Sequence, residues 1–326
     1  MSAIIKIFWN RSQTRVRAGW RLIIQLAVMM LFIVIFAIFD SYFNDLLPES
    51  AIAEGDTILF PLWIFLSSLI SIWLVGRFID KRRLADFGLR FNRSWWVQLG
   101  FGAALAAFLM TGIFLIEKAF GWVSVTETCV SKIEGMSFPG AILLALGTFA
   151  LAAIAEELTA RGYQIKNVSE GLNFRPLTRR IALMLAVLFS SMLFGLGHAV
   201  NPEATVISTI GLFLTGIFYG LSYVLTGELA LPIGFHIAWN FFENSVFGFP
   251  VSGEDLGASF IGMLQRGPVL LTGGAFGPEA GLFGIGAHLV AILAVLVWVR
   301  LYRGKIILLE ELAEPDLRKR DSERSN

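Results

Sequence analysis

The chain has 326 residues, of which 56% are hydrophobic and 16% are charged, and its mean hydropathy is +0.71. Soluble proteins carry about 25% charged residues, so this composition excludes an ordinary soluble domain and indicates a polytopic membrane protein. The net charge of +1 gives no sign of a nucleic-acid-binding surface, and the single cysteine, Cys129, excludes an internal disulfide and a multi-cysteine metal site.

Long apolar stretches recur along the chain. A helix needs about 20 mostly apolar residues to cross the hydrocarbon core of a bilayer. The first stretch is too long for the apolar region of a cleavable signal, and no small-x-small site follows it. The pattern predicts an all-α, polytopic membrane helical bundle that forms one domain, 1–326, with about eight transmembrane helices. The expected helices are 22–39, 58–75, 97–116, 139–160, 181–198, 205–225, 229–249 and 282–302.

Lysine and arginine alternate between the expected loops. The N-terminal stretch NRSQTRVRAGWR and the loops GRFIDKRRLADFGLRFNR and RGYQIKNVSEGLNFRPLTRR are basic, whereas loop 40–57 has neither residue and loop 248–281 has only Arg266. Cytoplasmic loops carry the excess of Lys and Arg. We therefore expect a multi-pass protein of a cell membrane, a bacterial inner membrane, with both termini and the charged tail 303–326 in the cytoplasm.

Two segments outside the expected spans also have predicted structure. The stretch NRSQTRVRAGWR is expected to lie along the inner membrane surface as a short amphipathic segment. In loop 248–281, Ser252 and Asp255 have the spacing of a capping box ahead of an apolar run, which predicts a short helix on the outer leaflet.

Three clusters of polar residues interrupt the apolar spans. The fourth span contains EELTAR, with Glu156, Glu157 and Arg161; the fifth ends in FGLGH, with His198; the seventh contains HIAWN, with His236 and Asn240. Ionisable groups inside a membrane are costly, so each cluster is a candidate for function.

Helical spacing predicts roles for these residues. Residues four apart share one face of a helix, so Glu157 can pair with Arg161, and Glu156 is left without that partner. A carboxylate in apolar surroundings without a close cation suits a general base. His236 and Asn240 also share a face and can both donate hydrogen bonds to a developing oxyanion.

Each cluster also has a purely structural interpretation. Glu157–Arg161 could be an ion pair at a helix end, His198 an interfacial histidine, and His236–Asn240 a contact between helices. Glu243 and Asn244 continue the polar face of the seventh span. His288 is expected to be structural.

Together the three motifs resemble those of the CPBP family of intramembrane glutamic endopeptidases, which includes type II CAAX prenyl proteases, bacteriocin-processing proteins and Abi-like proteins. The family pattern is Glu-Glu-x-x-x-Arg, then Phe-x-x-x-His, then His-x-x-x-Asn. The matching residues occur in this order within 139–249, which we interpret as the catalytic core. They are Glu156, Glu157, Arg161, Phe194, His198, His236 and Asn240.

The resemblance implies hydrolysis of a peptide bond without a metal or another cofactor. Glu156 would activate a water that His198 helps to orient, His236 and Asn240 would form the oxyanion hole, and Glu157 with Arg161 would support them. The expected partners are a peptide or membrane-protein substrate and the lipid bilayer, without nucleic acid.

Two alternatives and one conflict remain at this stage. Glu156, His198 and His236 could instead be the ligands of a zinc protease, or the polar cluster could belong to a non-catalytic accessory protein. The conflict concerns depth, because Glu156 lies near the inner end of its expected span and His198 about 25 Å along the next one, at 1.5 Å per residue. A helix that continues past Arg161 would bring Glu156 closer to the middle of the membrane.

Overall fold

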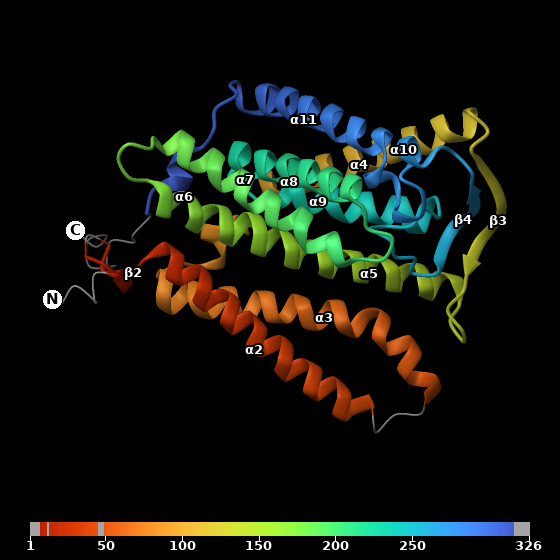
Figure 1. The fold of residues 1–326 in the computed structure, drawn as a ribbon, viewed down its shortest axis with the longest axis horizontal. Coiled ribbons are helices and arrows are strands. Elements are labelled where there is room, and N and C mark those ends of the chain that lie inside the picture. Colours follow the sequence, from red (N-terminus) through yellow and green to blue (C-terminus); the bar gives the residue numbers. More distant parts are fainter. Residues whose placement is uncertain (1–6, 12, 45–48, 316–326) are drawn as a thin grey trace.

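The computed structural model describes residues 7–11, 13–44 and 49–315. For residues 43–44 and 49–58 it describes the backbone alone. Most of its long elements are helices that run along one common direction (Figure 1). Among the described residues, seven helices are long and apolar enough to cross a membrane, which confirms the expected all-α polytopic bundle. These spans are Ala18–Tyr42, Leu59–Asp80, Arg93–Ala119, Phe138–Leu172, Arg179–Val200, Val206–Thr226 and Leu282–Arg303.

The elements follow one another as a succession of helices with two small strand pairs. The α-helices are α2 (Ala18–Asn44), α3 (Glu49–Val75), α4 (Arg93–Ala119), α5 (Phe138–Glu157), α6 (Lys166–Leu172), α7 (Arg179–Gly197), α8 (Val206–Thr226), α9 (Ala230–Asn240), α10 (Val269–Thr272) and α11 (Leu282–Arg303). The π-helical segments are η1 (Gly76–Asp80), η3 (Leu158–Ile165) and η5 (Phe241–Val246). The 3₁₀ turns are η2 (Leu84–Phe87), η4 (His198–Val200), η6 (Gly274–Phe276), η7 (Pro278–Ala280) and η8 (Glu310–Ala313). The strands are β1 (Trp9–Asn10), β2 (Arg15–Val16), β3 (Val123–Ser131) and β4 (Ala258–Gln265).

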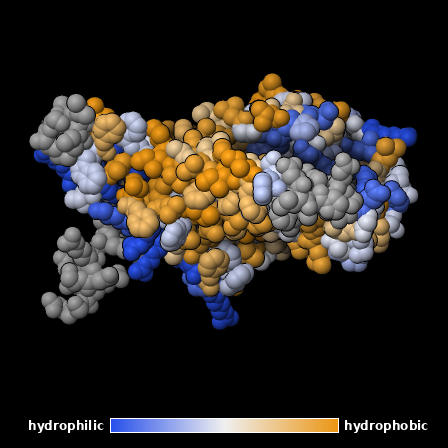
Figure 2. Space-filling view, turned by 90° about the horizontal axis from the view of Figure 1, so that it is seen from below, coloured by the Kyte–Doolittle hydropathy of each residue, from blue (hydrophilic) through white to orange (hydrophobic). Residues whose placement is uncertain are grey.

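Apolar residues form a belt around the bundle. Figure 2 shows a broad hydrophobic area across the middle of one face, with hydrophilic residues gathered toward the two ends. Many large apolar side chains of α2 and α11 are exposed, among them Ile38, Leu293 and Leu301. An exposed apolar belt of this kind is what a bilayer covers.

The expected seventh span is shorter than predicted. Only 11 residues, α9, are α-helical, and six residues of η5 follow in π geometry. Gly227 and Gly248 have positive φ angles and end this segment on both sides. Nine residues of α9 are buried, because α9 passes through the interior of the bundle rather than along its lipid-facing surface.

Close approach between α4 and α9 depends on two glycines. A Cβ at Gly234 would lie 2.1 Å from the carbonyl oxygen of Leu99, and a Cβ at Gly102 would lie 2.4 Å from that of Leu231. Small residues at such crossings let two helix backbones come into contact. The sequence of α9 therefore fixes its position against α4.

The fourth span continues well past its expected end at residue 160. α5, η3 and α6 form one continuous helical rod, Phe138–Leu172, of 35 residues. Glu156 consequently lies near the middle of the rod, which removes the depth conflict with His198.

Loop 248–281 does not contain the short helix predicted after Ser252 and Asp255. Residues 258–265 form β4 instead, which pairs antiparallel with β3 at one end of the bundle (Figure 1). Asp255 does not cap a helix, because its carboxylate accepts hydrogen bonds from Lys132 Nζ at 2.8 Å and from the Gly257 N–H at 2.9 Å. The pairing of β4 with the distant strand β3 therefore outweighs the local preference for a helix.

The N-terminal segment is not the amphipathic surface segment that we expected. β1 and β2 form a small hairpin, and Arg15 is buried with its Nη2 2.9 Å from Glu170 Oε2. Glu170 also pairs with Arg21 and Arg82, and Arg21 lies 3.1 Å from Asp80. This buried ionic cluster ties the hairpin to α6. Of the expected tail 303–326, residues 316–326 lie outside the described part of the chain.

Candidate active site

Phe194 and four polar residues from the three motifs line one cavity. Glu156 on α5, His198 at the end of α7, and His236 and Asn240 on α9 surround a cavity of about 210 Å³. A second cavity of about 420 Å³ shares Glu156 and His198 with the first and extends to side chains of α2 and α3. Glu156 and His198 therefore lie where the two cavities meet.

Glu157 forms the predicted pair with Arg161 and holds a third residue in addition. Its Oε1 accepts hydrogen bonds from Arg161 Nη1 at 3.0 Å and from His236 Nδ1 at 3.1 Å. The side chains of Glu157 and Arg161 are both fully buried. A buried carboxylate needs such charged partners, and Glu157 here fixes the ring of His236 as well.

The bond to Glu157 determines what His236 can offer to the cavity. Because Nδ1 donates to the carboxylate, Nε2 is directed to the other side, 3.9 Å from Glu156 Oε2. A neutral imidazole would present a lone pair at Nε2, and only the doubly protonated ring presents a donor there. A hydrogen bond from His236 to an oxyanion thus requires the imidazolium form.

Two aromatic rings support the charged groups. The guanidinium carbon of Arg161 lies 4.3 Å from the ring centre of Phe194 and 4.9 Å from that of Tyr219. Tyr219 also stacks on His236, with 5.0 Å between the ring centres. Cation–π contacts of this kind stabilise a desolvated guanidinium. The phenylalanine of the FGLGH motif is therefore a packing surface for Arg161.

His198 and Asn240 are free to bind a ligand in the cavity. His198 Nδ1 lies 2.8 Å from the Phe194 carbonyl oxygen and donates to it, so Nε2 of the neutral ring can accept a hydrogen bond from water. Asn240 follows His236 by one turn and lines the same cavity. Its NH₂ group can donate to an oxygen bound in the cavity.

The helices that carry Glu157 and Asn240 both change from α-helical to π-helical geometry directly after these residues. The π-helical segment η3 begins directly after Glu157, and η5 begins directly after Asn240. Single π-helical turns inside longer helices occur frequently at functional sites. No motif or periodicity in the sequence predicts these two changes from α-helix to π-helix.

Sequence reasoning missed Glu279. This glutamate of η7 lines the smaller cavity, is only 4% exposed, and accepts a hydrogen bond from the Ser252 hydroxyl. Burial raises the pKa of its carboxyl, although the bond from Ser252 acts in the opposite direction. The loop GPEAG has no periodicity, so nothing in the sequence linked Glu279 to the three motifs.

The other polar residues noted in the sequence lie outside the two cavities. Glu243 is fully buried near Gly277, and Asn244 donates to the Phe249 carbonyl oxygen at 3.0 Å. His288 bonds the Gly284 carbonyl oxygen and packs against Trp239, in agreement with a structural role.

The described side chains can be searched for groups that could coordinate a metal ion. In residues 7–11, 13–44 and 49–315, no group of three His, Cys, Asp or Glu side chains is placed to hold an ion. Metal independence itself stays a prediction.

The comparison with known families identifies the segment that carries the site. Residues 138–242 match the family model described as "Type II CAAX prenyl endopeptidase Rce1-like". These residues form an Rce1-like domain. The Rce1-like domain contains all seven residues of the three motifs, which confirms the resemblance to the type II CAAX proteases.

One curated relative and the solved structures complete the comparison. "Uncharacterized protein YyaK" of Bacillus subtilis (strain 168) is 26% identical over 195 residues, which are 57% of this chain and 62% of that relative. No solved structure matches the chain significantly. The Rce1-like domain and the apolar spans together describe a multi-pass membrane protein.

Proposed function

We propose that the chain is an intramembrane endopeptidase that hydrolyses a peptide bond with a water activated by Glu156. The observation that carries this proposal is that Glu156 and His198 line both cavities, and that His236 and Asn240 line the smaller cavity with them. The match of residues 138–242 to a family of prenyl endopeptidases supports the same reaction class.

The proposed reaction uses each residue for one task. A water lies between Glu156 and His198 Nε2, and Glu156 removes its proton while the oxygen attacks the scissile carbonyl carbon. Asn240 and the imidazolium of His236 donate hydrogen bonds to the resulting oxyanion. Glu156 then passes the proton to the leaving amine as the C–N bond breaks. The Oε2 atom of Glu156 has no hydrogen-bond partner among the described residues, so it is available for this proton.

The larger cavity has apolar side chains in its lining that suit an apolar segment of a substrate. Met29 of α2, Ile64 of α3 and Leu193 of α7 line it. α3 is anchored beside this cavity, since Ser68 Oγ donates to the Ala155 carbonyl oxygen at 3.2 Å. We propose that an apolar part of a peptide or membrane-protein substrate lies there, and a lipid-modified side chain, as the name of the family implies, is compatible with this lining.

The test replaces the proposed base. Glu156→Gln keeps the shape of the side chain and removes its basicity, so we expect a loss of about 10²–10⁴-fold in turnover with an unchanged melting temperature. Comparing membrane and secreted peptides between wild-type cells and cells with the variant would identify substrates. Glu311→Gln is the matched control, because Glu311 belongs to an exposed acidic pair remote from both cavities. Near-normal turnover by purified Glu156→Gln would end the proposal.

A zinc mechanism is the alternative with one observation in its favour, the 3.9 Å between Glu156 Oε2 and His236 Nε2. Against it, Asn240 beside His236 is a poor zinc ligand and a good neutral donor. Elemental analysis of active protein and an assay after phenanthroline treatment distinguish the two. We expect no stoichiometric zinc and full activity; loss to the chelator with rescue by zinc would assign Glu156, His198 and His236 as ligands.

A further inference from the structure

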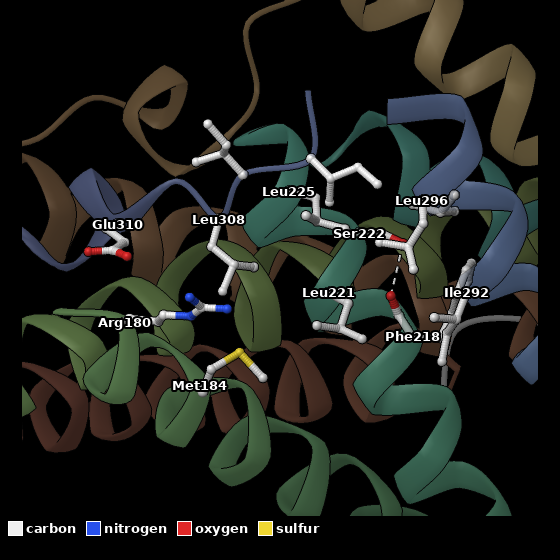
Figure 3. Close-up of a pocket in the computed structure, with 13 residues that line it drawn as sticks. Arg180, Met184, Phe218, Leu221, Ser222, Leu225, Ile292, Leu296, Leu308 and Glu310 are labelled. Carbon is white, nitrogen blue, oxygen red and sulfur yellow. Dashed lines mark hydrogen bonds between the residues drawn. The ribbon is translucent and has the colours of Figure 1, made fainter. Parts of the chain in front are cut away.

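A third cavity lies between α7, α8 and α11. It has a volume of about 490 Å³ and shares no lining residue with the other two. Figure 3 shows its walls, which come from α7, α8, α11 and the segment before η8. Its apolar lining includes Leu221 and Leu225 of α8, Ile292 and Leu296 of α11, and Ile306 and Ile307 of the segment before η8.

The walls of this cleft are fixed by hydrogen bonds. The Leu309 N–H donates to the Val224 carbonyl oxygen at 2.9 Å, and Arg303 donates to the Leu225 carbonyl oxygen at 3.1 Å. Ser222 offers no polar anchor inside, because its hydroxyl donates to the Phe218 carbonyl oxygen at 2.8 Å (Figure 3). The cleft is thus preformed and apolar inside, and apolar cavities are poor sites for water.

Two opposite charges stand at one end of the cleft. Arg180, in the first turn of α7, and Glu310, the first residue of η8, both line it (Figure 3). Neither has an ion pair with any residue that the structure describes. Their neighbours, by contrast, are engaged: Arg179 pairs with Glu314, and Arg303 bonds the end of α8. Among the described residues that line this cleft, the charged ones are therefore one cation and one anion that have no ion pair.

This end of the cleft lies where lipid headgroups are expected. α7 begins and α11 ends here, and Trp298 and Tyr302 of α11 stack with 5.3 Å between their ring centres. Trp and Tyr gather at the interface between hydrocarbon and water. Exposed apolar residues, among them Ile306 and Ile307, adjoin the opening.

We propose that the cleft binds a phospholipid whose headgroup carries both a phosphate and a primary ammonium. One acyl chain lies between α8 and α11, the phosphate binds the guanidinium of Arg180, and the ammonium faces the carboxylate of Glu310. The volume of about 490 Å³ is within the range of about 300–1,000 Å³ typical of ligand cavities. A guanidinium is the preferred partner of phosphate oxygens. The carboxylate of Glu310 attracts an ammonium group, so it favours a zwitterionic headgroup over an anionic one, which has no ammonium group.

The experiment measures lipid binding by the purified full chain in an uncharged detergent. Native mass spectrometry and melting curves are recorded with phosphatidylethanolamine, phosphatidylcholine, phosphatidylglycerol and diacylglycerol. We expect phosphatidylethanolamine to bind tightest and diacylglycerol to have no effect. Arg180→Gln should weaken the binding of all three phospholipids about tenfold, as loss of one charged hydrogen bond implies. Glu310→Gln should remove only the preference for phosphatidylethanolamine over phosphatidylglycerol.

Two further variants make the result decisive. Leu296→Trp fills the cleft and should abolish specific binding, while Arg300→Gln, which removes an exposed charge from the same end of α11 without touching the cleft, should leave binding unchanged. Equal binding of all four lipids, or equal effects of Arg180→Gln and Arg300→Gln, would refute the site. Tighter binding of phosphatidylglycerol than of phosphatidylethanolamine would refute the assigned headgroup. Because the readout is lipid binding, the result does not depend on the proposed proteolysis.

Discussion

At the residue scale, a single oxygen atom of Glu157 connects two of the three motifs. It accepts hydrogen bonds from Arg161, four residues away on the same helix, and from His236, 79 residues away on another. The distance between the candidate base and the candidate oxyanion hole therefore depends on a residue that need not take part in the chemistry.

Removing the charge of Glu157 should affect both stability and rate. Glu157→Gln leaves the buried guanidinium of Arg161 without its counterion, and breaking a buried ion pair costs about 3–5 kcal/mol. We expect a lower melting temperature in detergent and a lower turnover for both Glu157→Gln and Arg161→Ala. If both variants melted like the wild type, the pair would contribute nothing to the folded state; Glu311→Gln again serves as the control.

Glu279 predicts a pH dependence of stability. Since burial raises its pKa in the folded protein, the folded state keeps a proton that the unfolded chain releases near its ordinary pKa of about 4.3. Stability therefore falls as the pH rises from that value through the pKa of the folded state. Glu279→Gln removes this contribution, so its melting temperature should decline less between about pH 4.5 and about pH 8 than that of the wild type. Parallel melting curves over this range would contradict the expectation.

At the element scale, α9 is the short, buried helix that carries two of the proposed site residues. Its 11 residues include His236 and Asn240, and its position depends on backbone contact with α4. A span lined by lipid could shift by small amounts, whereas a buried helix in contact with its neighbours on all sides cannot.

Enlarging Gly234 should move this helix. A Cβ there would lie 2.1 Å from the Leu99 carbonyl oxygen, so Gly234→Ala forces the two backbones apart. We expect a loss of about 1–3 kcal/mol in stability, typical of overpacking, and a loss of turnover because His236 and Asn240 move with α9. Gly100→Ala on α4 is the control, since a Cβ at Gly100 meets no atom within 4 Å. Equal melting temperatures and rates for the two variants would contradict the predicted contact.

At the scale of the whole molecule, the chain places different structures at the two ends of the bundle. The β1–β2 hairpin and η8 lie at one end, and the β3–β4 pair lies at the other (Figure 1). The seven long spans together with α9 and η5 make eight passes, an even number. This parity agrees with termini on one side, and from the Lys and Arg distribution we propose that this side is the cytoplasm of a bacterial cell.

Cys129 provides a native test of this topology. It is exposed in β3, at the end opposite the hairpin. An impermeant thiol reagent should label it in intact cells, from outside. In a Cys129→Ser background, Lys305→Cys should be labelled only after the cells are opened. The reverse pattern would invert the topology.

The sequence by itself determined the properties that depend on one segment at a time. Composition and hydropathy indicated a membrane bundle, because crossing a bilayer requires each span separately to be apolar. The spacing of four residues predicted the Glu157–Arg161 pair, because both residues belong to one helix. The three motifs identified the Rce1-like domain in the same way, since each is a short local pattern.

Only the tertiary structure decided the contacts between segments. The bond between Glu157 and His236, the entry of Glu279 into the cavity, and the β3–β4 pairing that replaced a predicted helix all join residues far apart in the chain. The length of α9 was also decided in this way, because a helix enclosed by other helices does not have to match the thickness of the bilayer. Hydropathy and helical periodicity describe one segment at a time. The positions of the segments relative to one another are determined by side-chain packing between them.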